Sequence, residues 1–476
     1  MSRCTRRAWA RSSVAGALFG GALLAGCGPR GKAAPAVRHG VMAVSVALDV
    51  YALQNDGTVA SRNRLYRSIL NRFEETHRGI RVNLTSFLPT QSNMAEILAG
   101  TAPDVFPDCC VYGNYVQGGL LLDLAPFLKR DNVNPSIWSP GQVHTFDTGS
   151  GVFALSRNVD AYAFAVRLDT FDQAGIGYPH PDWTYQEFSR LAATLTRKGG
   201  TGSPTRYGAG FQNGMGDLMQ ILPGFGGRTT NPGRTHQQLS TPAGVAAANW
   251  LLGELIYPGV ATFATSWSGN GGANLGNGRL VLQEFQINQL LPSYTAWGSS
   301  FPWVFYPPPR FPHGRANPVS NDFWAVSGST RQPDAAWSLI YWLSAGTTFQ
   351  KFMMKTFLFS PALNALWSEW IATVEATVPG LKGRHLEYFA EAAQKGWGTP
   401  QPWFRFGSTQ ALAADGAWWG KLLARSVPIG TGLSQMDSQV NAIVAAARQV
   451  PVPSLKTRTQ AASIARRRLD RMLTAT

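Results

Sequence analysis

The sequence predicts an α/β protein with two lobes, and three observations lead to this fold class. The chain has 476 residues, more than one hydrophobic core usually serves. Apolar strand patterns alternate with helical patterns twice, first over residues 41–106 and again over residues 207–307. Two extended stretches, residues 152–166 and 321–327, read as crossings between these regions. Two alternating units joined by two crossings is the pattern of a bilobed molecule.

The first predicted unit alternates strand and helix. Its first helix is predicted because Leu65, Ile69 and Phe73 recur at helical spacing, with charged residues between them. In order, we expect a strand at 41–53, a helix at 62–77, a strand at 80–84, a helix at 93–98 and a strand at 104–106. This order favours a mostly parallel sheet, whose ligand edge would be formed by the loops near Gln54, Phe87 and Asp108.

The second predicted unit follows the first crossing and repeats the alternation. Thr184 and Glu187 have the spacing of a capping box at the start of one of its helices. We expect helices at 168–174, 183–197, 216–222 and 241–257, strands at 207–211 and 303–307, and a helix-to-strand segment at 278–285. After residue 333 the chain is largely helical, with apolar-periodic runs at 334–344, 346–354, 411–423 and 435–450.

The formal net charge is +15, and its location decides what it means. Residues 1–26 contribute four positive charges, residues 27–38 contribute three, and residues 454–476 contribute a net five. The body, residues 39–453, therefore carries only +3 and has no Lys/Arg-rich run that would follow a phosphate backbone. We expect no nucleic-acid partner, because terminal charge of this kind suits export and a solvated tail.

The N-terminal segment has the order of an export signal. Four arginines precede the apolar run 14–24, which is too short to span a bilayer as a helix, and the segment ends in Leu24-Ala25-Gly26-Cys27. This ending resembles a bacterial lipobox, in which Cys27 becomes the lipidated first residue of the mature chain. The alternative is an ordinary signal peptide with an incidental cysteine. Both the general and the twin-arginine export routes stay open.

The remaining cysteines are few. If Cys4 leaves with the signal and Cys27 carries lipid, only the adjacent Cys109 and Cys110 remain. Consecutive Cα atoms lie about 3.8 Å apart, below the usual disulfide span of about 4.4–6.8 Å. Two interpretations therefore stay open. Either the two cysteines form a strained vicinal disulfide in a rigid apolar turn, or both are reduced thiols. A metal site is not expected, because adjacent cysteines do not easily ligate one ion together.

Several local strings resemble the family-1 extracellular solute-binding proteins of ABC importers, which are typified by carbohydrate binders. These strings occur in the family's order over roughly residues 41–450: FEETHRGIRVNL at 73–84, EILAGTAPDVF at 96–106, LLDLAPFL at 121–128, RLDTFDQAGIGYPHPDWTYQEFSRLAATLT at 167–196, QILPGFGGRT at 220–229, NGRLVLQEF at 277–285 and NDFWAVSGSTRQPDAAWSLIYWL at 321–343. Two departures concern the ligand more than the fold. Residues 153–157 replace the family's Gly-Leu-Pro-like string, and residues 286–288 lack an aromatic residue.

The resemblance implies a class-II-type periplasmic binding-protein fold, with discontinuous lobes joined by a hinge. It also implies a ligand in the interlobe cleft and delivery of that ligand to an ABC transporter permease. The expected parts are a signal peptide at 1–26, a lipid-anchored tether at 27–40, a first lobe at 41–158 plus 320–375, a second lobe at 159–319 plus 376–453, and a basic tail at 454–476.

A cleft for a neutral polyol needs aromatic faces and side chains that pair with hydroxyl groups. Aromatic residues in loops or on crossings are the stacking candidates: Tyr112, Trp267, Trp324, Trp397, Trp403 and Phe404. Trp250, Trp337 and Trp342 lie on apolar helix faces and are expected in the core. The polar candidates follow strands or open crossings: Gln54, Asn55, Asp56, Asp108, Asn114, Arg157, Asp160, Tyr162, Glu284, Asn321 and Asp322. For each of these, a turn or capping role is the competing interpretation. A bridge between Cys109 and Cys110 would present an apolar face to the ligand.

Enzyme interpretations find little support. The sequence has no G-x-S-x-G, H-E-x-x-H or Walker-type motif, and its seven histidines are dispersed. No pair of carboxylates stands out for glycoside hydrolysis, although spacing alone leaves that reaction open. We therefore expect a binding protein without catalytic residues, cofactor or metal. The alternatives are a secreted binding or sensor protein for a non-sugar ligand and, with less support, a glycoside-active enzyme.

Overall fold

The computed structural model describes residues 41–48, 59–85, 96–97, 99–109, 112–149, 151–200, 202–212, 214–263, 272–319, 322–395, 398–400 and 404–449. The predicted signal peptide, tether and basic tail therefore lie outside the described residues. Within them, no helix combines the length and the hydrophobicity needed to cross a membrane.

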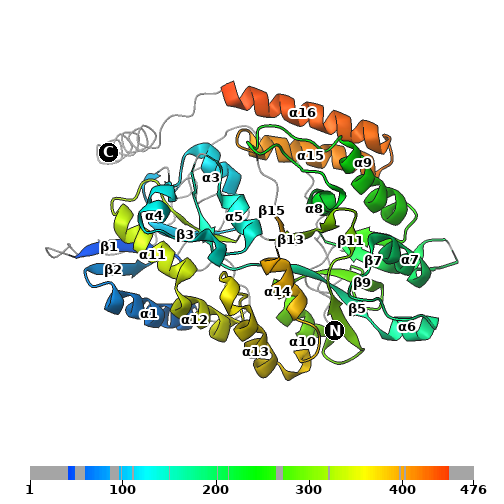
Figure 1. The fold of residues 1–476 in the computed structure, drawn as a ribbon, viewed down its shortest axis with the longest axis horizontal. Helices are drawn as coiled ribbons and strands as arrows, with labels where there is room; N and C mark the ends of the chain where they lie inside the picture. The colour runs from blue at the N-terminus through cyan, green and yellow to red at the C-terminus, as the bar shows by residue number, and fades with distance from the viewer. Residues whose placement is uncertain are drawn as a thin grey trace, which may run out of the picture. The chain divides into compact units, whose positions relative to one another are not determined.

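A five-stranded sheet organises the first unit (Figure 1). Its strands, in spatial order, are β2 (Ile80–Leu84), β1 (Met42–Val46), β3 (Val105–Asp108), β14 (Phe323–Val326) and β4 (Leu155–Ser156). β1 pairs in parallel with β2 and β3, as predicted, whereas β14 runs antiparallel to both β3 and β4. The chain therefore returns to the first sheet after building the second one, so the first unit is discontinuous in sequence.

The helices of the first unit pack on this sheet. They are α1 (Val59–Thr76), α3 (Tyr112–Gly118), α4 (Ala125–Arg130), the 3₁₀ turn η2 (Pro135–Ile137), α5 (Pro140–Phe146), α11 (Pro333–Ala345) and α12 (Thr347–Phe357). α1 turns Tyr66, Ile69, Leu70 and Phe73 inward, and all four are buried. Leu65, which the periodicity placed on the same face, is 41% exposed. Each fully buried large apolar side chain contributes about 1.5–3 kcal/mol, so the four buried residues fix the helix against the sheet.

A larger mixed sheet organises the second unit. Its spatial order is β10 (Trp303–Tyr306), β5 (Tyr162–Arg167), β9 (Leu280–Gln286), β7 (Pro204–Phe211) and β6 (Arg197–Lys198), with β8 (Ala261–Phe263) also paired to β7. β9 runs parallel to β7 and antiparallel to β5. The surrounding helices are α6 (Asp169–Ala174), α7 (Tyr185–Leu195), α8 (Met215–Ile221), η3 (Leu222–Phe225), α9 (Pro242–Ala248), a π-helical segment (Asn249–Ile256), η5 (Ile287–Gln289) and α10 (Leu290–Trp297).

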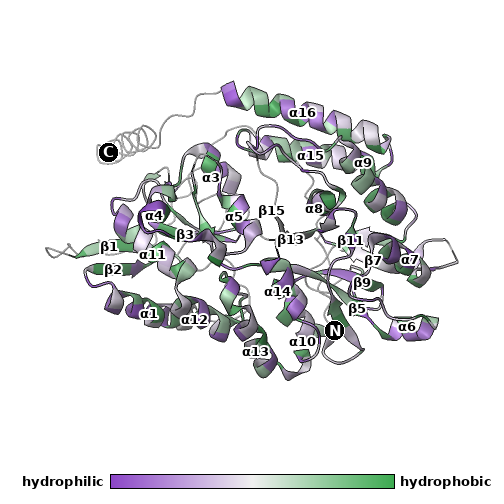
Figure 2. Ribbon diagram, viewed as in Figure 1, coloured by the Kyte–Doolittle hydropathy of each residue, from purple (hydrophilic) through white to green (hydrophobic). Residues whose placement is uncertain are grey.

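The remaining elements connect and cover the two units. Small pairs form between β11 (Arg310–Phe311) and β12 (Gly314–Arg315), and between β13 (Asn317–Val319) and β15 (Gly398–Pro400). The C-terminal helical part comprises η6 (Asn364–Leu366), α13 (Trp367–Thr377), η7 (Pro379–Leu381), α14 (Glu387–Gln394), α15 (Ser408–Leu423) and α16 (Ile429–Gln449). α15 and α16 pack against each other, and α16 contacts α9 of the second unit. Most helices in Figure 2 carry both hydrophilic and hydrophobic residues, as expected for helices with one face on a core.

Hydrophobic cores support both sheets. The largest core runs from Val44 and Phe73 in the first unit, through Trp324 and Trp337, to Phe305 in the second. A separate core of the second unit surrounds Trp183 and Trp250 on the other face of its sheet. The predicted core positions of Trp250 and Trp337 are confirmed, and Trp342 is half-buried.

Several predicted elements are confirmed and others are corrected. The Thr184–Glu187 capping box forms in full at the start of α7. The helix predicted at 241–257 is instead a short α-helix that passes into a π-helical segment at Asn249. The stretch predicted as continuously extended, residues 152–166, holds two strands, β4 and β5, separated by irregular backbone at the crossing. α16 begins at Ile429, six residues before the predicted start.

Candidate ligand-binding site

Asp108 lies where ligands were predicted, at the carboxyl end of β3, and it is buried. Its Oδ1 accepts a hydrogen bond from the Cys109 backbone N–H at 2.6 Å, and its Oδ2 accepts one from the Tyr115 hydroxyl at 2.7 Å. Both carboxylate oxygens are therefore engaged by the chain itself. In this conformation Asp108 holds the start of the loop that follows β3. This is the turn or capping role that we considered as the alternative to ligand binding.

Cys109 and Tyr112 follow directly. Cys109 is buried and disulfide-bonded, so it is not the reduced thiol of the alternative interpretation. Cys110 lies outside the described residues, and the pairing of the two cysteines stays a prediction. Tyr112 is 2% exposed and its hydroxyl donates to the Phe146 carbonyl at 2.8 Å. Its ring packs edge-to-face against Phe146 and Phe323, and burial raises the pKa of its hydroxyl.

Among the described residues, several hydrogen bonds connect the two units, and three of them involve Arg234 and the start of α15. The Arg234 guanidinium, from a loop of the second unit, donates to the His144 carbonyl of α5 at 2.8 Å. At the start of α15, the Ser408 backbone N–H donates to Gln117 Oε1 of α3 at 3.4 Å. The neighbouring Thr409 hydroxyl donates to Asn114 Oδ1 of α3 at 3.0 Å. These contacts join the two units, and Asn114 is among the predicted polar candidates.

Arg234 is the charged member of this closure. Its backbone has a φ of 54°, in the left-handed region, which a non-glycine residue adopts at a cost of the order of 1 kcal/mol. Burial lowers the pKa of its guanidinium to about 10, while the nearby Tyr112 and Asp147 act in the opposite direction. The side chain is therefore a cation at neutral pH. It lies against a carbonyl in the last turn of α5, where helix geometry favours positive charge.

The two crossings meet in a buried charged cluster. Arg157 on the first crossing pairs with Asp322 on the second at 2.8 Å, and both side chains are buried. Asp160 accepts hydrogen bonds from the side-chain amides of Asn158 at 3.0 Å and Asn288 at 3.2 Å. Desolvation and the neighbouring Asp322 carboxylate raise the pKa of Asp160 well above its usual range. Burial therefore disfavours the charged form of Asp160, which lies beside the Arg157–Asp322 ion pair.

A second buried acid pair lies at the end of β9. Glu284 is buried, and its Oε2 accepts a hydrogen bond from the Gln212 backbone N–H at 3.1 Å. Burial and the adjacent Asp217 carboxylate raise the pKa of Glu284 well above its usual range. Gln289 completes the group by exchanging hydrogen bonds with the Gln212 side-chain amide at 2.9 and 3.1 Å. Burial therefore disfavours the charged form of Glu284 inside the second unit.

The other described candidates are packed side chains. Tyr162 is buried in β5 opposite Gln286, and Trp324 is 0% exposed within the large core of the first unit. Phe404 is also fully buried, in a small core between α15 and α16. Their roles as ligand contacts stay predictions, which this packed conformation does not display. Eight cleft candidates and the predicted lipidation site lie outside the described residues: Gln54, Asn55, Asp56, Cys110, Trp267, Asn321, Trp397, Trp403 and Cys27.

Sequence reasoning missed several residues of the site. Arg234, Gln117 and Thr409 contact across the units, yet they lie in a loop, near the end of α3 and at the start of α15, where the sequence pattern carries no signal for that contact. Asp217 is a polar candidate that the sequence could have indicated, because it lies in the first turn of α8, a few residues after the end of β7. No group of three or more His, Cys, Asp or Glu side chains in the described part of the chain is arranged to hold a metal ion.

Two α/β units, joined by two crossings and closed onto each other by direct hydrogen bonds, define a two-lobed binding protein. The family model of the bacterial extracellular solute-binding protein matches residues 59–345, and the chain belongs to this family. Members of the family are extracellular binding proteins, so this protein is an exported one. No curated protein sequence matches the chain.

Solved structures show the same fold. An ABC substrate-binding protein of Listeria monocytogenes in complex with cycloalternan is 18% identical with a TM-score of 0.64, covering 85% of this chain and 99% of that one. The cyclic α-maltosyl-1,6-maltose binding protein of Arthrobacter globiformis is 17% identical, with a TM-score of 0.63 and coverages of 85% and 99%. UgpB of Mycobacterium tuberculosis, in complex with glycerophosphocholine, is 15% identical, with a TM-score of 0.61 and coverages of 86% and 99%. These likenesses show a two-lobed periplasmic binding-protein fold.

Proposed function

We propose that this protein captures a sugar or oligosaccharide between its lobes and delivers it to the permease of an ABC importer. The family assignment carries this proposal, because the family consists of extracellular solute-binding proteins. Two of the structurally similar proteins bind cyclic saccharides, which supports a carbohydrate as the solute. The similar structure with glycerophosphocholine keeps a polar non-sugar solute as the second candidate.

The electrostatics of the described residues favour a neutral ligand. Burial and a neighbouring carboxylate disfavour the charged forms of Asp160 and Glu284, and the Arg157 cation is paired with Asp322. These buried acids therefore favour hydrogen bonding to a neutral solute over attraction of an ion. Hydroxyl groups of a polyol pair well with amide and carboxyl side chains, of which Asn114 and Gln117 lie at the contact between the lobes.

A thermal-shift screen tests the proposal. Mono- and oligosaccharides, polyols, polyamines, sugar phosphates and glycerophosphodiesters would each be added to the purified protein. A ligand at 100 times its dissociation constant stabilises the folded state by about 2.7 kcal/mol, which a melting curve resolves. A saccharide as the best hit supports the proposal, and a diamine or phosphodiester as the best hit overturns it. Release of product from a chromogenic glycoside would instead favour the enzyme alternative.

We also propose that Cys27 carries a lipid that holds the protein at the outer face of the cytoplasmic membrane. Leu24-Ala25-Gly26-Cys27 and the preceding apolar run support this proposal. Detergent phase partitioning of the protein expressed in a bacterium tests it. The wild-type chain is expected in the detergent phase and Cys27→Ala in the aqueous phase, and equal partitioning of the two chains would overturn the lipid anchor.

A further inference from the structure

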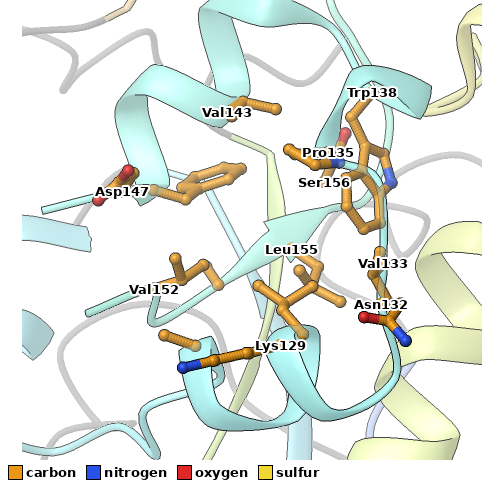
Figure 3. Close-up of a pocket in the computed structure, with 14 residues that line it drawn as sticks. Lys129, Asn132, Val133, Pro135, Trp138, Val143, Asp147, Val152, Leu155 and Ser156 are labelled. Atoms are coloured by element: carbon orange, nitrogen blue, oxygen red, sulfur yellow. The ribbon is translucent and has the colours of Figure 1, made fainter. Parts of the chain in front are cut away.

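A cavity of about 540 Å³ lies within the first unit, between α4, α5 and β4 (Figure 3). Ten of the 14 residues that line it are apolar. Its volume falls in the range of about 300–1,000 Å³ that small-molecule sites occupy, and such sites combine apolar walls with a few polar groups. None of the residues that connect the two units, such as Arg234 or Thr409, lines it. The cavity therefore has a lining of its own, and on the side of Asp147 it borders the interlobe contact, because Asp147 is near enough to Arg234 to act on the pKa of its guanidinium.

Some residues that line the cavity are buried and others are half-buried. Trp138 and Leu155 are each 3% exposed and form part of the floor. The rim consists of half-buried apolar side chains: Leu128, Val133, Val143 and Val152. An apolar ligand that covered this surface would gain about 25 cal/mol for each Å² removed from water. The wall is firm on one side, because the Phe146 ring packs edge-to-face against Tyr112 and Phe323.

Two opposite charges lie at one end of the cavity. In Figure 3 the Lys129 ammonium and the Asp147 carboxylate lie on the side of Val152, away from Trp138. Asp147 Oδ1 accepts a hydrogen bond from the Gly149 backbone N–H at 2.8 Å. Within the described residues, neither Asp147 Oδ2 nor Lys129 Nζ has a hydrogen-bond or ion-pair partner. One cation and one anion at the same mouth suit a head group that carries both charges, because charge-assisted hydrogen bonds are the strong ones.

We propose that this cavity binds a single-chain zwitterionic amphiphile, with its hydrocarbon chain against Leu155 and Trp138 and its head group between Lys129 and Asp147. The apolar lining accounts for the chain, and the paired charges at the mouth account for the head group. A singly charged amphiphile should bind more weakly, because either Lys129 or Asp147 would repel its head group. The site binds in the first lobe alone and does not depend on the identity of the solute in the cleft.

Alkylphosphocholines with six, eight and ten carbons are the probes, titrated calorimetrically below their micelle concentrations into the purified full chain. They contain no sugar, so failure of the carbohydrate proposal leaves this test intact. Each buried methylene contributes about 0.8 kcal/mol, which is about a fourfold gain in affinity. We expect one-to-one binding that tightens by about this factor per methylene. Affinity that does not change with chain length would overturn the proposal.

Val143→Trp tests the location, because it enlarges a rim side chain of α5 and fills part of the cavity. The matched control is Val427→Trp, a half-buried valine of the second unit. We expect Val143→Trp to weaken decylphosphocholine binding at least tenfold, while Val427→Trp and the melting temperatures of both variants stay near wild type. Equal binding by the two variants would place the amphiphile elsewhere and overturn the proposal.

Lys129→Glu tests the head group, and because Lys129 is exposed this variant should fold normally. It makes the mouth doubly acidic, so decyltrimethylammonium should bind more tightly than decylphosphocholine, which reverses the wild-type order. An unchanged order would refute the assignment of the charged mouth.

Discussion

Replacing Arg234 by alanine should weaken ligand binding without destabilising either lobe. The guanidinium donates a hydrogen bond across the lobes to the His144 carbonyl at 2.8 Å. Hydrogen bonds to charged groups contribute about 1.5–3 kcal/mol, and the lower value suits a half-buried side chain. Because that contact joins the two lobes, its loss should remove about 1.5 kcal/mol from the free energy that holds them together, which is about a tenfold change in the ratio of closed to open molecules.

The assay is calorimetric titration of the saccharide that the thermal-shift screen identifies. A dissociation constant about tenfold weaker than wild type is expected for Arg234→Ala, with Arg234→Lys in between because it keeps the charge. Arg228→Ala is the matched control, since Arg228 is an exposed arginine of the same lobe six residues earlier. If Arg234→Ala binds within twofold of wild type and of Arg228→Ala, the interlobe hydrogen bond does not contribute to closure and the reasoning fails.

Three further predictions concern stability and are measured by urea unfolding. Burial raises the pKa of Asp415 to about 7 from 3.8, and its Oδ1 accepts from Gln237 at 2.8 Å. Between about pH 4 and pH 7 the folded chain therefore binds one more proton there than the unfolded chain, so its stability falls as pH rises. At 1.36 kcal/mol per pKa unit, this protonation should lower the free energy of unfolding of the wild-type chain by up to about 3 kcal/mol between pH 5 and pH 8, and Asp415→Asn should abolish that decrease. An equal decrease in the wild-type chain and in Asp415→Asn would contradict this. Asp322→Ala should cost up to about 3–5 kcal/mol, because it removes the carboxylate paired with the buried Arg157 cation, and a cost below about 1 kcal/mol would refute the buried pair. Thr184→Ala should cost about 1 kcal/mol through loss of the α7 cap, and no change would show that the cap is dispensable.

Local sequence signals predicted the parts of the fold that local physics determines. The capping box of α7 and the inward face of α1 at Ile69 and Phe73 depend on neighbours within a few residues, and both formed as predicted. The π-helical segment after α9 was missed because its apolar pattern is also compatible with an ordinary helix. The return of β14 to the first sheet was anticipated only as an extended crossing, because strand pairing across more than 200 residues leaves no periodic trace.

The site was less predictable than the fold. Asp160 and Glu284 were selected because they lie at a crossing and a strand end, and both are in buried polar groups. Their pairing with Asp322 and Asp217 depends on tertiary packing, which no spacing in the sequence encodes. Trp324 was a candidate because aromatic residues occur both in hydrophobic cores and in sugar-binding sites. In the structure it is packed in a hydrophobic core. Arg234 was missed because a lone arginine in a glycine-containing loop resembles any solvated surface residue.

Capture of a neutral saccharide requires the two lobes to close around it. Small-angle X-ray scattering of the purified chain, with and without the best saccharide of the screen, measures this closure. We expect a smaller radius of gyration at saturating saccharide, and at a subsaturating concentration we expect a smaller change in Arg234→Ala than in the wild-type chain. An unchanged radius with a saccharide bound, or compaction only by a charged solute, would contradict it.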